Sequence, residues 1–193
     1  MEFPDLVRKS RTYRRFDEKH AISPETLRSL IECARLTPSG GNMQTLRFFG
    51  TCSPEWNQKV YATLSWAGYL PEWGGPTAGE RPSAYVVICN DSTLKKVTPE
   101  IDVGIAAQTI VLAATSGGLG GCMFGSVKRE KLREILSLAA GIEISLVVAL
   151  GKPVEKVVLE VASPGGSIKY YRDPDGTHHV PKRALSEILL AIR

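Results

Sequence analysis

The chain has 193 residues, of which 43% are hydrophobic and 23% are charged, values that are ordinary for a globular protein of one domain. Its formal net charge of +4 is mild, so composition gives no strong reason to expect a nucleic-acid partner. The N-terminus shows no targeting signal, and the most apolar stretch, residues 101–114, is shorter than the roughly 20 residues that a membrane span needs. We therefore expect one domain over residues 1–193, a cytoplasmic location and no membrane partner.

Helix-start patterns recur along the first half of the chain. Residues 3–9 predict a short helix. A serine or threonine, a proline and a glutamate then follow one another at three places, and they predict helices over 24–36, from 54 to about 66, and from 99 to about 116. The last of these helices is apolar almost all round, which is typical of a helix buried in a core or in a subunit interface.

Three compact apolar runs are typical of buried strands, and they mix irregularly with the helices. A short extended stretch surrounds Met123, and a charged amphipathic helix is expected over 128–137. Residues 156–179 are polar and rich in turn signals, so we expect irregular structure there and then a last helix from about Lys182. Without a regular strand–helix–strand period, the pattern predicts one α+β domain. The three apolar runs are 46–52, 84–89 and 144–150.

The residues available for acid–base or metal chemistry are few. The four cysteines lie far apart and form no CxxC pair, which argues against a zinc or iron–sulfur site, and we expect most of them to be buried free thiols. On a strand His178 and His179 would point to opposite faces, so we expect surface histidines and no metal site. A chain with no nucleophile–histidine pair is expected to take its chemistry from a cofactor.

Two segments have the composition of ligand-binding segments. Residues 8–15 hold five cations interleaved with hydroxyls, a mixture that binds phosphate through guanidinium forks. Residues 38–44 (PSGGNMQ) combine glycines, which let a flat ligand approach the backbone, with amides that suit the edge of its ring. Taken alone, the first segment also fits a solvated basic face and the second a plain turn.

A third segment, residues 117–125 (GGLGGCMFG), offers backbone amides to a ligand. It is not the G-x-G-x-x-G fingerprint of dinucleotide-binding folds, because Met123 replaces the third glycine and the segment follows a helix. A phosphate-binding G-x-x-x-x-G-K-[ST] loop is also absent, since Gly151 and Lys152 are followed by Pro153. Both observations lower the odds of a Rossmann or P-loop enzyme.

Taken in order, these segments resemble the nitroreductase family of FMN-dependent oxidoreductases over the whole chain. Residues 11–16 (RTYRRF) are similar to the family's R-S-x-R-x-F, and 38–44 match its P-S-x-x-N-x-Q. Residues 118–122 (GLGGC) are similar to G-L-G-x-C, and 151–153 to a late G-x-P. Each motif is weak alone, but all four in this order carry the resemblance. The chain departs from the family at Thr45–Arg47 (TLR), where Pro-Trp-Arg is common, and at Ser10, where many members have arginine.

The resemblance implies a nitroreductase-like α+β fold with a central, mostly antiparallel sheet flanked by helices, and a homodimer with FMN at its interface. It also implies three groups of cofactor-binding residues. The phosphate group is Arg11, Thr12 and Arg14, with Ser10 and Lys182 or Arg183 as further candidates. The loop group is Pro38, Ser39 and Asn42, which reach the flavin from the partner chain, and Gln44. The group along the flavin ring is Gly121, Cys122, Met123 and Gly125.

The family mechanism implied by the resemblance is ping-pong, with NAD(P)H as the electron donor and a nitroaromatic, a quinone or a similar small molecule as the acceptor. It requires no side chain as an acid, so no catalytic residue is assigned. Tyr69 and Trp73, in the Gly/Pro-rich stretch 68–82, either form a lid over the acceptor or pack that stretch onto the core. Three alternatives stay open: a dehalogenating or flavin-consuming enzyme of the same fold, a non-enzymatic flavin-binding module and, ranked last, a nucleic-acid binder.

Overall fold

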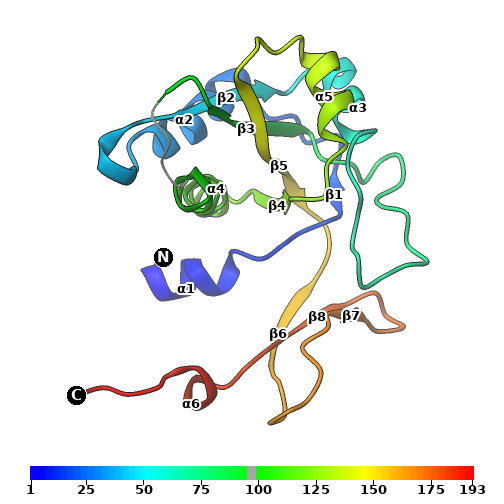
Figure 1. Cartoon of the computed structure of the whole chain (residues 1–193). Helices are drawn as coiled ribbons and strands as arrows, with labels where there is room; N and C mark the ends of the chain where they lie inside the picture. The colour runs from blue at the N-terminus through cyan, green and yellow to red at the C-terminus, as the bar shows by residue number, and fades with distance from the viewer. Residues whose placement is uncertain (95–98) are drawn as a thin grey trace. The chain divides into compact units, whose positions relative to one another are not determined.

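The computed structural model describes residues 1–94 and 99–193 (Figure 1). The chain forms two compact units, which we call the main unit and the C-terminal unit. The prediction of one domain over the whole chain stays a prediction. The main unit consists of residues 1–66 and 75–154, and the C-terminal unit of residues 67–74 and 155–193.

A five-stranded antiparallel sheet forms the centre of the main unit. The strand order is β1-β5-β3-β2, and β4 pairs with β5. The three predicted strands are confirmed, and β5 is longer than predicted because different parts of it pair with β3, β4 and β1. The strands are β1 (Phe16–Asp17), β2 (Leu46–Thr51), β3 (Ala84–Asp91), β4 (Gly120–Phe124) and β5 (Ile142–Pro153).

Helices cover both faces of this sheet (Figure 1). Alternate residues of β3 point to opposite faces: Val86 and Ile88 pack with α2 and α4, while Tyr85 and Val87 pack with α3 and α5. The helix α1 lies beside α4. No helix of the described chain is both long and apolar enough to cross a membrane. The helices are α1 (Phe3–Lys9), α2 (Pro24–Arg35), α3 (Pro54–Tyr61), α4 (Pro99–Ser116) and α5 (Arg129–Leu136).

The helix starts agree with the sequence patterns better than the helix ends do. The Ser23 hydroxyl accepts a hydrogen bond from the Thr26 amide at 3.1 Å, as an N-cap does. Thr98, the expected cap of α4, lies outside the described residues. The helix α3 ends at Tyr61 and not near residue 66, because the following residues form a turn and Leu64 then bridges to Val127.

The C-terminal unit contains a small sheet that the sequence did not predict. Its middle strand, β8 (His178–Lys182), pairs with β6 (Val157–Val161) in parallel and with β7 (Tyr171–Arg172) antiparallel. The prediction of irregular structure over 156–179 is therefore wrong. The last helix is also shorter than predicted: Lys182 ends β8, and α6 covers only Leu185–Ile188. The valines of β6 have high strand propensity, whereas the more polar residues of β7 and β8 are held in strands by pairing with distant segments.

The aromatic residues of segment 67–74 pack on the other part of the C-terminal unit. The ring of Tyr69 lies 4.9 Å from that of Tyr170, measured between centroids. The guanidinium of Arg172 stacks 4.3 Å above the ring of Trp73 and is also paired with Glu155. These contacts anchor the segment to the C-terminal unit, so neither ring belongs to the two hydrophobic clusters of the main unit. The lid alternative stays a prediction.

Two predictions about isolated side chains need correction. His178 is only 1% exposed, because β8 is the middle strand of its sheet and the ring of Tyr170 lies 5.2 Å from the imidazole. The prediction that both histidines lie on the surface is therefore wrong for His178. All four cysteines are free, but Cys33 is exposed and Cys52 half-buried, so only Cys89 and Cys122 are buried as predicted.

His179 is held between two carboxylates, and this arrangement is sensitive to pH. Its Nδ1 contacts Glu160, and its Nε2 lies 3.0 Å from Asp173. Both nitrogens donate only in the protonated ring, and the contacts with Asp173 and then Glu160 raise the pKa of His179 above its usual value. Because the pKa of His179 is higher in the folded state, protonation of the ring stabilises the fold. This stabilisation is complete below the unfolded pKa of about 6.5, and it is lost as the pH rises through the folded pKa.

The substitution His179→Gln tests this contact. We expect the melting temperature of the variant to fall below that of the wild type at pH 5–6, about the window set by the unfolded histidine pKa, and the difference to shrink as the pH rises toward 9. Thermal melts of both proteins at matched pH values measure the difference. A difference that stays constant over the whole range would show that the protonated imidazole contributes nothing.

Candidate functional site

The N-terminal basic segment runs alongside β4. Thr12 forms a parallel bridge with Gly121, and the Tyr13 amide donates to the Gly121 carbonyl at 3.0 Å. The ring of Tyr13 packs over Gly120, where a Cβ atom would lie 2.5 Å from the ring. A glycine is therefore required at position 120 for this close approach. The structure thus brings together two of the three groups of predicted site residues.

Arg11 carries a positive charge that no carboxylate neutralises among the described residues. One terminal nitrogen donates to the Val7 carbonyl, and the buried Nε has no hydrogen-bond partner. Burial lowers the pKa of Arg11, because the charged form loses hydration. A guanidinium that is desolvated without a carboxylate is suited to bind an anion such as a phosphate group.

The neighbours of Arg11 divide into two kinds. Ser10 and Arg14 are buried and Thr12 is exposed, so the segment offers the mixture of cations and hydroxyls that the sequence predicts. Arg15, by contrast, points to another partner, since its Nε donates to Glu80 at 2.8 Å. The cation cluster at 8–15 is therefore not one continuous basic face.

The residues of β4 differ in what they present. Gly121 and Cys122 are buried, and the thiol of Cys122 lies in the core shared with α3 and α5. Any contact of Cys122 with a ligand outside that core would come from its backbone. Met123 is 37% exposed, and Gly125 is exposed with open space around it. The exposed end of β4 is therefore the part of the ring-binding group that is open to a ligand.

The loop at 38–44 is folded tightly on itself. Gly41, Asn42 and Gln44 have φ angles of +55°, +55° and +49°, in the left-handed region. Residues other than glycine rarely adopt these φ angles, and those that do are often found at binding sites. The Gln44 amide donates to the Ser39 hydroxyl at 3.2 Å, and this contact holds the ends of the loop together. Pro38, Asn42 and Gln44 are exposed.

Asp102, which was not selected from the sequence, binds the backbone of this loop. Its side chain is buried at 3% exposure, and Oδ1 accepts a hydrogen bond from the Gly40 amide at 3.0 Å. Its other oxygen is buried and has no partner. Ser39, Gln44 and Asp102 line a cavity of about 170 Å³ beneath the loop. The available signal was that, of the two carboxylates in the first turn of α4, Asp102 falls among the apolar residues of this helix.

Within one chain the loop and β4 lie at opposite ends of α4. Asp102 sits near the start of this helix, and Gly120 begins β4 shortly after its end. A helix of 18 residues is about 27 Å long. One copy of the chain therefore does not assemble both groups around one small ligand. Lys182 and Arg183 are exposed on the C-terminal unit, and their role stays a prediction.

The role of Asp102 can be tested by hydrogen exchange. In Asp102→Ala the Gly40 amide loses a charged acceptor, so we expect the amides of residues 40–44 to exchange roughly 10-fold faster or more, the effect of losing one such hydrogen bond. Glu100→Ala, which removes an exposed carboxylate from the same helix, is the control and should leave these rates unchanged. Equal rates in the wild type and Asp102→Ala would show that Asp102 does not order the loop.

Comparisons with known proteins show which family the chain resembles. The model of the nitroreductase family matches residues 7–67 and 90–152, which include the basic segment, the loop and β4. A protein of Archaeoglobus fulgidus, provisionally named an NADH dehydrogenase/NAD(P)H nitroreductase, is 30% identical over 142 residues, which are 70% of this chain and 76% of that protein.

Two solved structures share the fold. A nitroreductase family protein of Clostridium difficile 630 has a TM-score of 0.68 at 21% identity, over 98% of this chain and 97% of that chain. An FMN-dependent nitroreductase of Clostridium difficile R20291 has a TM-score of 0.63 at 21% identity, over 78% of this chain and 87% of that chain. The α+β fold predicted from the sequence is thereby confirmed.

Proposed function

The chain belongs to the nitroreductase family, and from this premise we propose that it binds FMN and uses NAD(P)H to reduce a small acceptor molecule by a ping-pong mechanism. FMN, when bound, supplies the hydride and electron transfer for which the side chains of this chain have no equipment. The observation that carries the proposal is Arg11, a partly desolvated cation that has no carboxylate partner among the described residues and lies beside β4. One structural neighbour is itself named an FMN-dependent nitroreductase.

The basic segment fits the phosphate end of FMN. Arg11 would donate to the phosphate oxygens, and the exposed hydroxyl of Thr12 is the neighbouring donor. Arg14 is buried next to them and adds positive charge. Because Thr12 bridges to Gly121, a ligand whose phosphate lies at this segment has its remainder along β4. Met123 and Gly125 would then border the ring.

A second copy of the chain would complete this site. One side of α4 stays uncovered in the main unit: Ile101 is 62% exposed, Gln108 is exposed, and Ile105 and Leu112 are half-buried. If two copies pair through this side with their α4 helices antiparallel, the start of one helix lies beside the end of the other. The partner subunit's Pro38, the partner subunit's Ser39 and the partner subunit's Asn42 would then face β4, the position that the family resemblance implies.

The site residues do their work by positioning and by excluding water. The loop at 38–44 presents Asn42 and Gln44, whose side chains carry both donors and acceptors for a ring edge. The apolar side of α4, once covered by a partner, keeps water from one side of the site. Such a site selects flat, conjugated acceptors by stacking. We therefore propose nitroaromatics or quinones as the acceptor class.

The phosphate contact is tested by Arg11→Gln. The variant loses a charge-assisted hydrogen bond to the phosphate, so we expect its affinity for FMN to fall about 10-fold or more. Arg8→Gln is the matched control, because Arg8 belongs to the same basic run but is exposed and paired with Asp5. Titration of the flavin-free proteins with FMN, followed by fluorescence, measures both affinities. If Arg11→Gln binds FMN as tightly as Arg8→Gln does, the phosphate does not lie at Arg11.

The partner copy is tested by Ile105→Glu. This substitution places a charge on the uncovered side of α4, and we expect a wild-type dimer to become a monomer that binds FMN more weakly. Ala62→Glu, at an exposed position just after α3, is the control and should remain a dimer. Sedimentation velocity gives the oligomeric state, and the flavin absorbance of the same samples gives the occupancy. A monomeric wild type that binds FMN fully would contradict the shared site.

A further inference from the structure

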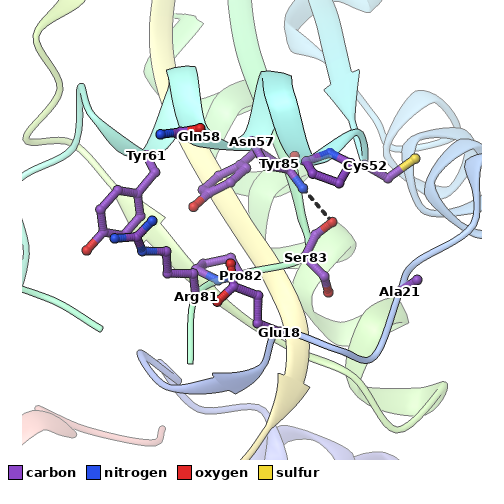
Figure 2. A pocket seen from close by; sticks show the side chains of 11 residues that line it. Glu18, Ala21, Cys52, Asn57, Gln58, Tyr61, Arg81, Pro82, Ser83 and Tyr85 are labelled. Carbon is purple, nitrogen blue, oxygen red and sulfur yellow. Dashed lines mark hydrogen bonds between the residues drawn. The ribbon is translucent and has the colours of Figure 1, made fainter. Parts of the chain in front are cut away.

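A separate cavity of about 280 Å³ opens on the α3 side of the sheet (Figure 2). It is bordered by α3, by the start of β3 and by the chain around residues 18–21. None of its lining residues belongs to the candidate flavin site. Several of them lie within 68–89, the stretch between the two parts of the chain that the family model matches. The titratable side chains that line the cavity are Glu18, Tyr61, Arg81 and Tyr85.

Tyr85 is a buried residue whose side chain lines this cavity. Its side chain is 1% exposed, and its hydroxyl has no hydrogen-bond partner among the described residues. Burial raises the pKa of Tyr85 well above its usual value, so the hydroxyl stays protonated and can donate. The hydroxyl therefore faces the cavity as an open donor, and polar groups in such a place are normally satisfied by water or a ligand.

Arg81 supplies a positive charge at the same place. Its guanidinium stacks on the ring of Tyr61, with Cζ 4.6 Å from the ring centroid, and its buried Nε has no partner. Within the described chain, no carboxylate forms a salt bridge with it. In Figure 2 the guanidinium of Arg81 and the hydroxyl of Tyr85 lie at the same end of the cavity, beside the ring of Tyr61. Two donors, one of them charged, therefore meet against an aromatic wall.

Glu18 limits the charge that the cavity accepts. Its carboxylate lies on the same wall and accepts a hydrogen bond from the Gly79 amide. A ligand with two negative charges would be repelled by this carboxylate. A ligand with a single negative charge can place that charge beside Arg81. The aromatic ring of Tyr61 and the prolines at 54 and 82 give the rest of the cavity an apolar lining. The volume is near the lower limit of about 300 Å³ for small-molecule pockets.

We propose that this cavity is a binding site for a small monocarboxylate with a flat, apolar body. The carboxylate accepts hydrogen bonds from the guanidinium of Arg81 and the hydroxyl of Tyr85, and the body stacks along Tyr61. This ligand gives the hydroxyl of Tyr85 an acceptor and neutralises the charge of Arg81, which forms no salt bridge among the described residues. The site does not depend on the flavin chemistry proposed above.

Benzoate is a suitable probe, and binding is followed by NMR titration of the purified protein. We expect saturable binding by the wild type, about 10-fold weaker binding by Arg81→Gln and a smaller loss, about threefold, by Tyr85→Phe, the effects of losing a charged and a neutral hydrogen bond. Benzamide, which has the same shape without the charge, should bind the wild type about as weakly as benzoate binds Arg81→Gln.

Arg35→Gln is the matched control, because it removes an exposed arginine that is paired with Glu32, and its affinity for benzoate should equal that of the wild type. Tyr85→Phe removes only an unpaired hydroxyl, so its melting temperature without benzoate should match or exceed that of the wild type, which shows that it folds. Failure of the wild type to bind benzoate would overturn the proposal. So would binding that Arg81→Gln and Tyr85→Phe leave unchanged, since benzoate would then lie elsewhere.

Discussion

The pairing of β5 along both of its edges determines where the candidate site lies. One edge of this strand pairs with β3 and the other with β4, and its last two residues pair with β1. Because β4 is fixed in this way, its outer edge is free to receive the N-terminal segment through the Thr12–Gly121 bridge. The pairing of β4 with β5 thus places the partly desolvated Arg11 at the edge of the sheet. The chemistry of the site depends on that placement more than on any reactive side chain.

The helix α4 imposes the second constraint. It is covered by the sheet and α2 on one side, and it separates the loop at 38–44 from β4 by about its own length. Its other side carries apolar residues that the main unit leaves uncovered. The proposed second copy would account for both facts, because it would cover the apolar side and bring its own loop to the far end. The shared flavin site and the uncovered helix are therefore two aspects of one proposal.

Sequence alone predicted those features that short-range chemistry determines. The cap at Ser23 and the strands of the main sheet follow from patterns within a few residues, and the structure contains them. Features that depend on distant partners were missed. The strand β8 forms because β6 and β7 pair with it, and His178 is buried for the same reason. The hydrogen bond between Asp102 and the Gly40 amide forms only in the folded chain, so no pattern within a few residues predicts it.

The most direct test of the central claim is a visible absorption spectrum of the purified protein, followed by anaerobic addition of NADH and, separately, of NADPH. The account predicts flavin bands that bleach with at least one nicotinamide and return when a quinone or a nitroaromatic is added. The same preparation after removal of flavin should take up added FMN. A protein that contains no flavin and takes up none would contradict the account, and bound flavin that neither nicotinamide bleaches would contradict the proposed reaction.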